Sequence, residues 1–140
     1  MTTPPDSIAA GAPDGHPPLG ALCDRMGILL VEARPGRVVA TMPVEGNTQP
    51  YGLLNGGASA VLAETLGSVA GSIHAGPDHY VVGLDINCTH HRAVREGTVT
   101  GVATPIAEGS TIASYEIRIT DERDRPVCTA RLTCLVRPRA

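Results

Sequence analysis

The residue of this sequence that most clearly suggests chemistry is Glu64. It is the only formally charged residue between Gly46 and Pro77, a stretch otherwise made of apolar, small and neutral polar residues. A carboxylate held in a low-dielectric cleft becomes more basic, which suits a general base or a nucleophile. The alternative for Glu64 is a side chain that turns into solvent or pairs with an arginine such as Arg92. We therefore treat Glu64 as a candidate reactive carboxylate.

Asn55, Gly56 and Gly57, which precede Glu64, predict a helix start that can stabilise a negative charge developing during a reaction. Asn55 is a favourable N-cap residue, and Gly56 and Gly57 follow it without side chains. The first N–H groups of a helix lack intrahelical acceptors and lie at its positive end, so they can stabilise an oxyanion. Glu64 lies roughly 11 to 12 Å further along the helix axis. Because one straight helix cannot bring both groups to one atom, we predict a homodimer in which an antiparallel helix supplies the second group.

Other reactive arrangements fit the sequence less well. Ser59 lies in GGASA, which lacks the Gly-x-Ser-x-Gly elbow of a serine hydrolase, and no Asp and His follow it as a convincing triad. His90 and His91 are adjacent, so on a strand they face opposite sides and cannot share a metal ion. We expect His91 to be exposed or structural. We also expect no metal and no separate cofactor.

One long helix has to position Glu64, and the sequence places it from residue 56 to about residue 75. On a helical wheel one face is large and apolar, formed by Leu62, Leu66, Val69 and Ile73. The opposite face, centred on Glu64, carries small residues, namely Gly57, Ala60, Gly67, Ser68 and Gly71. Glycine inside a helix costs about 1 kcal/mol relative to alanine, so this face predicts close packing against another backbone or a ligand. Such a helix is expected to be buried on nearly every side.

Runs rich in β-branched residues, separated by turn residues, predict six strands around this helix. They are expected at residues 27–33, 37–44, 80–91, 98–106, 111–120 and 126–136, after a short helix at 19–26. Short connections predict that the last four strands are antiparallel neighbours in sequence order. One helix covers only one face of a sheet, which predicts an α+β domain over residues 19–140. Residues 1–18, rich in Pro and Gly, are expected to form a disordered leader.

Composition argues against several other classes of protein. The 140-residue chain has 42% hydrophobic and 18% charged residues, as expected for one globular domain. A net charge of −3 and an aromatic complement of three Tyr argue against nucleic-acid binding. We find no apolar run suited to a membrane helix and no signal-peptide pattern, and expect a cytoplasmic protein without membrane contact. The cysteines form no CxxC pair and are expected to be reduced, with Cys128 and Cys134 facing one core.

Several segments resemble the hotdog-fold acyl-CoA thioesterases. The branch includes 4-hydroxybenzoyl-CoA thioesterase of the Arthrobacter type, the enterobactin-pathway proofreading thioesterase and 1,4-dihydroxy-2-naphthoyl-CoA thioesterase. The matching segments are QPYGLLNGGASAVLAETLGSVAG (49–71), VVGLDINCTHHR (81–92), REG (95–97) and EGS (108–110). The resemblance implies a long central helix wrapped by a six-stranded antiparallel sheet, a dimer with a continuous sheet, and usually a dimer of dimers. It also implies hydrolysis of an aryl or medium-chain acyl-CoA to free acid and CoA, with CoA part of the substrate.

The resemblance implies a role for each matching residue. Glu64 becomes the nucleophile or general base, and Gly56 donates its N–H to the thioester carbonyl. Gln49 orients the carbonyl or the attacking water, and Ser68 holds a water. Substrate contacts are implied for a further set, namely His90, Gly57, Arg92, Ser110 and Thr111. Within that set, His90 is expected near the acyl group, and Arg92 and Ser110 near the CoA nucleotide and its phosphates.

One matching position departs from the family pattern. Asn55 stands where the family usually has His, and Asn can cap the helix and hydrogen-bond near the carbonyl but cannot carry a proton. A second hypothesis therefore stays open, namely a non-catalytic acyl-CoA binding or sensing protein that releases no thiol. A hotdog dehydratase is a third hypothesis, but this helix lacks the histidine and paired carboxylate motif that such an enzyme uses.

Overall fold

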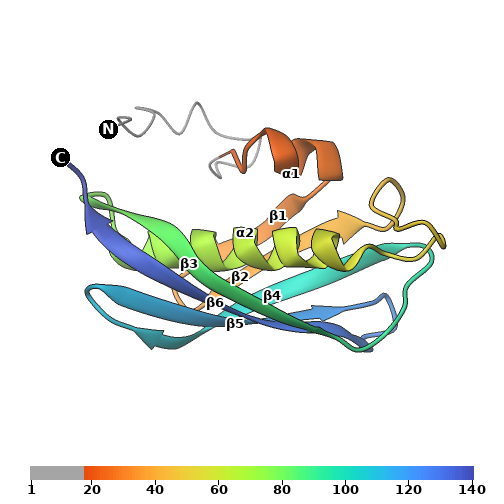
Figure 1. Ribbon diagram of the computed structural model, residues 1–140. Coiled ribbons are helices and arrows are strands. Elements are labelled where there is room, and N and C mark those ends of the chain that lie inside the picture. Colours follow the sequence, from red (N-terminus) through yellow and green to blue (C-terminus); the bar gives the residue numbers. More distant parts are fainter. Residues whose placement is uncertain (1–17) are drawn as a thin grey trace.

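The computed structural model describes residues 18–140, in which a curved sheet wraps one long helix (Figure 1). The elements in chain order are α1 (Ala21–Met26), β1 (Leu29–Arg34), β2 (Arg37–Pro43), α2 (Gly56–Ala75), β3 (His79–His90), β4 (Thr98–Glu108), β5 (Ile112–Thr120) and β6 (Pro126–Pro138). The predicted α+β class, the long helix and all six strands are confirmed, with small shifts at the element ends. Residues 1–17 of the predicted leader lie outside the described part of the chain.

The six strands form one antiparallel sheet in the order β1-β2-β4-β5-β6-β3. The hairpins β4–β5 and β5–β6 are as predicted, but β3 pairs with β6, and β4 pairs with β2 on its other side. The prediction that the last four strands follow in sequence order is therefore wrong. The connection from β3 to β4 is no tight turn, because Val94 first accepts a hydrogen bond from Leu54 N–H at 2.7 Å. Gly97, at φ 82°, then turns the chain into β4 and leaves β3 at the sheet edge.

Helix α2 lies in the concave side of the sheet and contacts all six strands (Figure 1). Leu62 and Leu66 are fully buried in the core, as their spacing predicts. Val69 and Ile73 belong to the same predicted face, yet they are only half-buried and line a cleft. The buried side of α2 is therefore rotated away from them toward the small residues.

The small residues of α2 pack against the chain's own sheet. A Cβ at Gly67 would overlap the side chain of Leu132 in β6, and one at Gly71 would lie 3.3 Å from Val81 Cγ2 in β3. The predicted close neighbour is thus neither a second backbone nor a ligand at these two positions, but side chains of β3 and β6. Ser72 is exposed, so the helix is not buried on nearly every side.

The loop between β2 and α2 is held by one buried amide. Asn47 Nδ2 donates to the carbonyls of Met26 and Pro43, at 2.7 and 2.8 Å. The Asn47 carbonyl in turn accepts a hydrogen bond from Asn55 N–H at 2.8 Å. Because Asn47 is 8% exposed, these bonds are shielded from water. They fix where α2 begins.

Two further features of the fold are the state of the cysteines and the length of the helices. All four cysteines are free, as predicted, and both Cys128 and Cys134 are buried in the core. Neither α1 nor α2, the helices within residues 18–140, is long and apolar enough to cross a membrane.

Candidate active site

The N-terminus of α2 carries an unused backbone donor. Asn55 is the N-cap, as predicted, and its Oδ1 accepts a hydrogen bond from Gly57 N–H at 2.7 Å. The N–H groups of Ala58 and Ser59 donate to the Asn55 carbonyl. Within residues 18–140 the Gly56 N–H makes no hydrogen bond. Since it lies at the positive end of a 20-residue helix, it is available to a carbonyl oxygen or an oxyanion.

A cleft of about 380 Å³ opens beside Gly56. Gln49, His90 and Arg92 line it with Gly56, so these predicted residues meet there. The His90 ring lies against the helix start, because a Cβ at position 56 would be 2.9 Å from His90 Nε2. Gln49 Oε1 accepts a hydrogen bond from Tyr51 N–H. This bond holds the Gln49 side chain and leaves its NH2 group able to donate to another oxygen.

A second cleft, of about 570 Å³, contains Glu64 and Ser68, one helical turn apart on α2. Its other walls are largely aliphatic and include Leu19, Ala33, Val69, Ile73 and Val81. The Glu64 side chain is half-buried, and burial raises the pKa of its carboxyl above the ordinary range. No ion-pair partner faces it in the part of the chain that the structure describes, so Glu64 does not pair with Arg92 of its own chain. A basic carboxylate without a counter-ion is suited to accept a proton.

The cleft of Gly56 and the cleft of Glu64 share no lining residue. A single chain therefore does not bring the free N–H and the carboxylate to one atom, which agrees with their separation of roughly 12 Å along the helix. Asn55 and Gly57 line a third, shallow hollow beside Met26. The Asn55 side chain thus acts here as a cap and lies outside both clefts.

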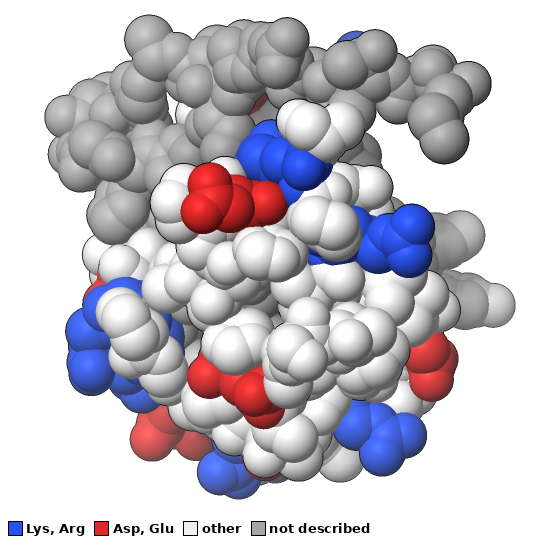
Figure 2. All heavy atoms as spheres, turned by 90° about the vertical axis from the view of Figure 1, so that its left-hand side faces the viewer, with Lys and Arg blue, Asp and Glu red and all other residues white. Residues whose placement is uncertain are grey.

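Ser110 and Thr111 lie at the opposite end of α2, in the connection from β4 to β5. His74, in the last turn of α2, contacts the Gly109 carbonyl through Nε2 at 2.8 Å. Figure 2 faces this end of the molecule and shows acidic and basic side chains interspersed over it rather than one basic patch. Arg92 lies at the other helix end, so within one chain these predicted contacts to the CoA nucleotide are not brought together.

On the outer side of the sheet, His91 is exposed, which agrees with the prediction that it is exposed or structural. Its Nε2 lies 2.9 Å from Thr129 Oγ1. His91, Arg92, Arg118 and Thr129 line a shallow hollow of about 400 Å³ there, and neither arginine has an ion-pair partner among the described residues. Arg92 therefore lines both this hollow and the Gly56 cleft. Sequence spacing could not indicate Arg118, because only the pairing of β6 with both β3 and β5 brings it near Arg92.

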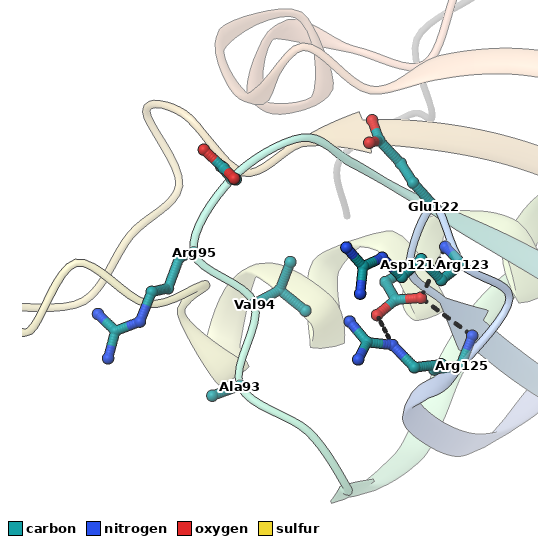
Figure 3. A pocket seen from close by; sticks show the side chains of 8 residues that line it. Ala93, Val94, Arg95, Asp121, Glu122, Arg123 and Arg125 are labelled. Carbon is teal, nitrogen blue, oxygen red and sulfur yellow. Dashed lines mark hydrogen bonds and ion pairs between the residues drawn. The ribbon is translucent and has the colours of Figure 1, made fainter.

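A further hollow, of about 370 Å³, lies between the β3–β4 connection and the β5–β6 turn (Figure 3). Two of its three carboxylates, those of Asp121 and Glu122, are engaged in holding that turn. Asp121 accepts hydrogen bonds from Arg125 Nε at 2.8 Å and from the N–H groups of Arg123 and Arg125, and these bonds lower the pKa of Asp121. Glu122 accepts from Thr98 N–H at 3.0 Å. We therefore assign this hollow a structural role.

Sequence reasoning missed two residues beside Glu64. Ser72 lies one turn beyond Ser68 on the same cleft wall, and the spacing of four residues could have indicated it. Gly83 of β3 lies directly against the Glu64 carboxylate. Its signal was an isolated glycine inside the strand-like run VVGLDIN, a pattern that indicates a bulge or a close approach.

Comparisons with known proteins agree on one family. The model of the thioesterase superfamily matches residues 51–128, more than half of the chain. The proofreading thioesterase EntH of Cronobacter sakazakii is 44% identical over 119 residues, which cover 84% of this chain and 87% of that relative. The 1,4-dihydroxy-2-naphthoyl-CoA hydrolase of Escherichia coli K12 is 51% identical over 98 residues, which cover 69% of this chain and 72% of that relative. The crystal structure of a Haemophilus influenzae thioesterase aligns with a TM-score of 0.81 at 43% identity, covering 84% of this chain and 83% of that one.

The residues matched by the family model include both Gly56 and Glu64, the central groups of the two clefts. The chain therefore belongs to the thioesterase superfamily, has the hotdog fold, and is a thioester hydrolase.

Proposed function

We propose that the protein hydrolyses an acyl-CoA thioester with an aryl or medium-chain acyl group to the free acid and CoA. The observation that carries this proposal is the half-buried Glu64 carboxylate, which has a raised pKa and no counter-ion among residues 18–140. The aliphatic walls of its cleft suit an acyl group. CoA as the thiol is supported by the Escherichia coli relative, whose name specifies a CoA thioester.

We also propose a homodimer with shared active sites. Its support is that Gly56 and Glu64 line separate clefts of one chain. Strand β3 is a sheet edge on which Val82 and Leu84 are 44% and 56% exposed, and such an edge favours pairing with a second strand. Antiparallel pairing of two β3 strands about a two-fold axis makes the two α2 helices antiparallel, so that Gly56 of each subunit faces Glu64 of the other. Two such dimers then assemble as a dimer of dimers.

In this arrangement the carbonyl oxygen of the thioester accepts a hydrogen bond from Gly56 N–H, and the Gln49 NH2 group orients it. Ionised Glu64 of the other subunit takes a proton from a water held by Ser68, and the water oxygen attacks the carbonyl carbon. The Gly56 N–H stabilises the oxyanion that forms. When the C–S bond breaks, the CoA sulfur leaves with the electron pair and takes the proton from Glu64. The acid is released and the carboxylate is regenerated.

The CoA phosphates are assigned to the two arginines that lack ion-pair partners in the described chain. Arg92 and Arg118 line one hollow, and Arg92 also lines the cleft of Gly56, where the thioester is placed. Guanidinium groups bind phosphate through paired hydrogen bonds. In the antiparallel dimer, Ser110 and Thr111 of the partner subunit come to the same end of the site as Arg92. These are the contacts proposed for the nucleotide.

The protein is expected to release free thiol from acyl-CoA substrates at neutral pH. A thiol reagent measures the release over a panel of benzoyl, 1,4-dihydroxy-2-naphthoyl, short-chain and medium-chain CoA thioesters. A blank without substrate corrects for the four free cysteines of the chain. Tight binding of acyl-CoA with no release from any thioester of the panel would favour the non-catalytic binding protein that Asn55 leaves open.

Shared sites predict that two inactive variants restore each other's activity. Glu64→Gln and Gly56→Pro subunits are mixed at equal concentration and refolded together, so that about half of the dimers contain one subunit of each kind. Each mixed dimer has one site with both native groups and one site with neither. We expect about a quarter of the wild-type turnover, against near-background turnover for either variant refolded alone. Turnover that stays at background in the mixture, with mixed dimers present, would mean that each site lies within one subunit.

A further inference from the structure

Glycine 83, in the middle of β3, lies where the reactive carboxylate needs space. A Cβ built on Gly83 would overlap Glu64 Oε1, and it would lie 3.2 Å from Glu64 Cδ. The three atoms nearest to that added atom, outside its own neighbours in sequence, all belong to the Glu64 carboxyl group. The carboxylate of α2 therefore occupies the volume that a side chain at position 83 would fill.

The backbone of Gly83 does not itself require glycine. The residue is absent from the positive-φ glycines of the described chain, so an L-amino acid can adopt its conformation. Glycine inside a strand also weakens it, because it adds chain entropy and leaves no side chain to pack. The strand register shifts between Gly83 and Asp85, which changes the side-chain alternation just after the glycine. Strand stability alone thus favours a residue with a side chain at position 83. The close contact with the Glu64 carboxylate, by contrast, favours glycine.

Among the described residues of its own chain, the groups nearest the Glu64 carboxylate are uncharged. Val81 and Gly83 face it from β3, and the thiol of Cys134 faces it from β6. Burial, together with the nearby Glu64 charge, raises the pKa of Cys134 to about 11, so this thiol is neutral wherever the enzyme works. On β1, which also borders the cleft, the carboxylate of Glu32 is paired with Arg34 and Arg37. The protonation of Glu64 is therefore governed by how far β3 keeps it from water.

We propose that Gly83 is a positioning residue for the thioesterase reaction: its missing side chain lets the Glu64 carboxylate lie against β3, facing the acyl cleft. This inference rests on the proposed function, because it takes Glu64 as the catalytic base. A methyl group at position 83 pushes the carboxylate off β3 toward solvent. The far end of a Glu side chain moves easily, so the fold itself accommodates the change.

The test compares Gly83→Ala with a control on the same strand, Asn87→Ala, whose side chain is exposed. For Gly83→Ala we expect kcat to fall about 100-fold with little change in KM, because a base displaced by about 1 Å loses its alignment. The acid limb of the kcat/KM profile should also move to lower pH, since a better solvated carboxyl has a lower pKa. Asn87→Ala should leave both unchanged. In a Glu64→Gln background, Gly83→Ala should cause no further loss.

A readout independent of activity separates this inference from the proposed function. The carboxyl of Glu64, labelled with ¹³C, is titrated by NMR in the wild type and in Gly83→Ala, and the resonance is assigned with Glu64→Gln. We expect the midpoint to move toward 4.5, the ordinary value for Glu, in Gly83→Ala. An unchanged midpoint together with wild-type kcat would overturn the positioning role. A shifted midpoint in a protein that hydrolyses no thioester would keep the geometry and reject the proposed function.

Discussion

Replacing Glu64 with glutamine is expected to lower thioester turnover by about 10²- to 10⁴-fold, the contribution of a positioned general base. Glutamine keeps the size and polarity of the side chain but cannot accept the proton of the attacking water. We expect the variant to fold and to bind acyl-CoA with little change. Initial rates of thiol release at saturating substrate, with circular dichroism and sedimentation as controls for fold and assembly, measure the effect.

The same carboxyl predicts the pH dependence of the reaction. Desolvation raises the pKa of Glu64, and the mechanism needs its ionised form. The kcat/KM of the wild type should therefore decline as the pH falls through that raised pKa, at a pH above the ordinary value of 4.5. This acid limb should be absent from the residual activity of Glu64→Gln.

Stability should change in the opposite direction to activity. The folded protein holds the Glu64 proton to higher pH than the unfolded chain does, so the free energy of unfolding falls as the pH rises from the ordinary pKa through the raised one. Above that window the wild type carries the full cost of a half-buried charge. Glu64→Gln should thus melt at a higher temperature than the wild type at neutral pH, and the difference should vanish below the ordinary pKa of Glu.

Near wild-type turnover by Glu64→Gln would show that Glu64 takes no part in the reaction. A single-turnover reaction in H₂¹⁸O tests for the nucleophilic role, because a general base delivers the label only to the product acid, whereas an anhydride opened at the Glu64 carbonyl carbon leaves it on Glu64. Label found on the Glu64 carboxyl after one turnover would instead mean that the carboxylate attacks the thioester and that water then opens the anhydride.

Gly56→Pro should reduce kcat by about 10²- to 10³-fold relative to Gly56→Ala, which is the usual effect of losing one oxyanion donor. Proline lacks the N–H that Gly56 leaves unbonded, yet it is well tolerated at the first position of a helix. Asn55, at φ −67° and ψ 129°, already has the extended conformation that a residue before proline adopts. The helix start should therefore persist while the donor is lost.

Gly56→Ala is the matched control because it keeps the N–H and adds the same Cβ. That atom would lie 2.9 Å from His90 Nε2 in both variants, so both displace the imidazole to a similar extent. The kcat ratio between Ala and Pro variants then measures the donor alone. Equal kcat values for the two variants would show that the oxyanion is stabilised elsewhere.

Much of the secondary structure could be predicted from local patterns. Helix α2 has the predicted bounds, and Asn55 caps it as its residue type indicates. The strands follow runs of β-branched residues between turns. The neighbour of β3 was predicted wrongly, because hairpin rules consider only the next strand along the chain. Residues 91–97 contain the turn signal Arg95-Glu96-Gly97, and nothing local reveals that the preceding residues cross the end of the sheet.

The candidate site, too, could be predicted only in part from local sequence patterns. Glu64 was indicated by a single charge in an uncharged run, and Gly56 by its place after an N-cap. The faces of α2 were predicted less well. Val69 and Ile73 were predicted to share one apolar face with Leu62 and Leu66, but they are only half-buried at the border of the core and line the Glu64 cleft, because β3 and β6 pack against the glycines of α2. A helical wheel ranks faces by side-chain size, whereas the depth of packing depends on which strands approach the helix.

The sequence by itself determined the elements and indicated the two candidate reactive groups, since caps, periodicity and an isolated charge act over a few residues. It also determined that one straight helix cannot bring Gly56 and Glu64 together, because helical rise follows from spacing alone. Only the tertiary structure decided that β3 lies at a sheet edge beside β6, and that Gly83 makes room for the Glu64 carboxylate. Those features arise from contacts between strands and helix that are distant in the chain, and such contacts are set by packing rather than by local propensity.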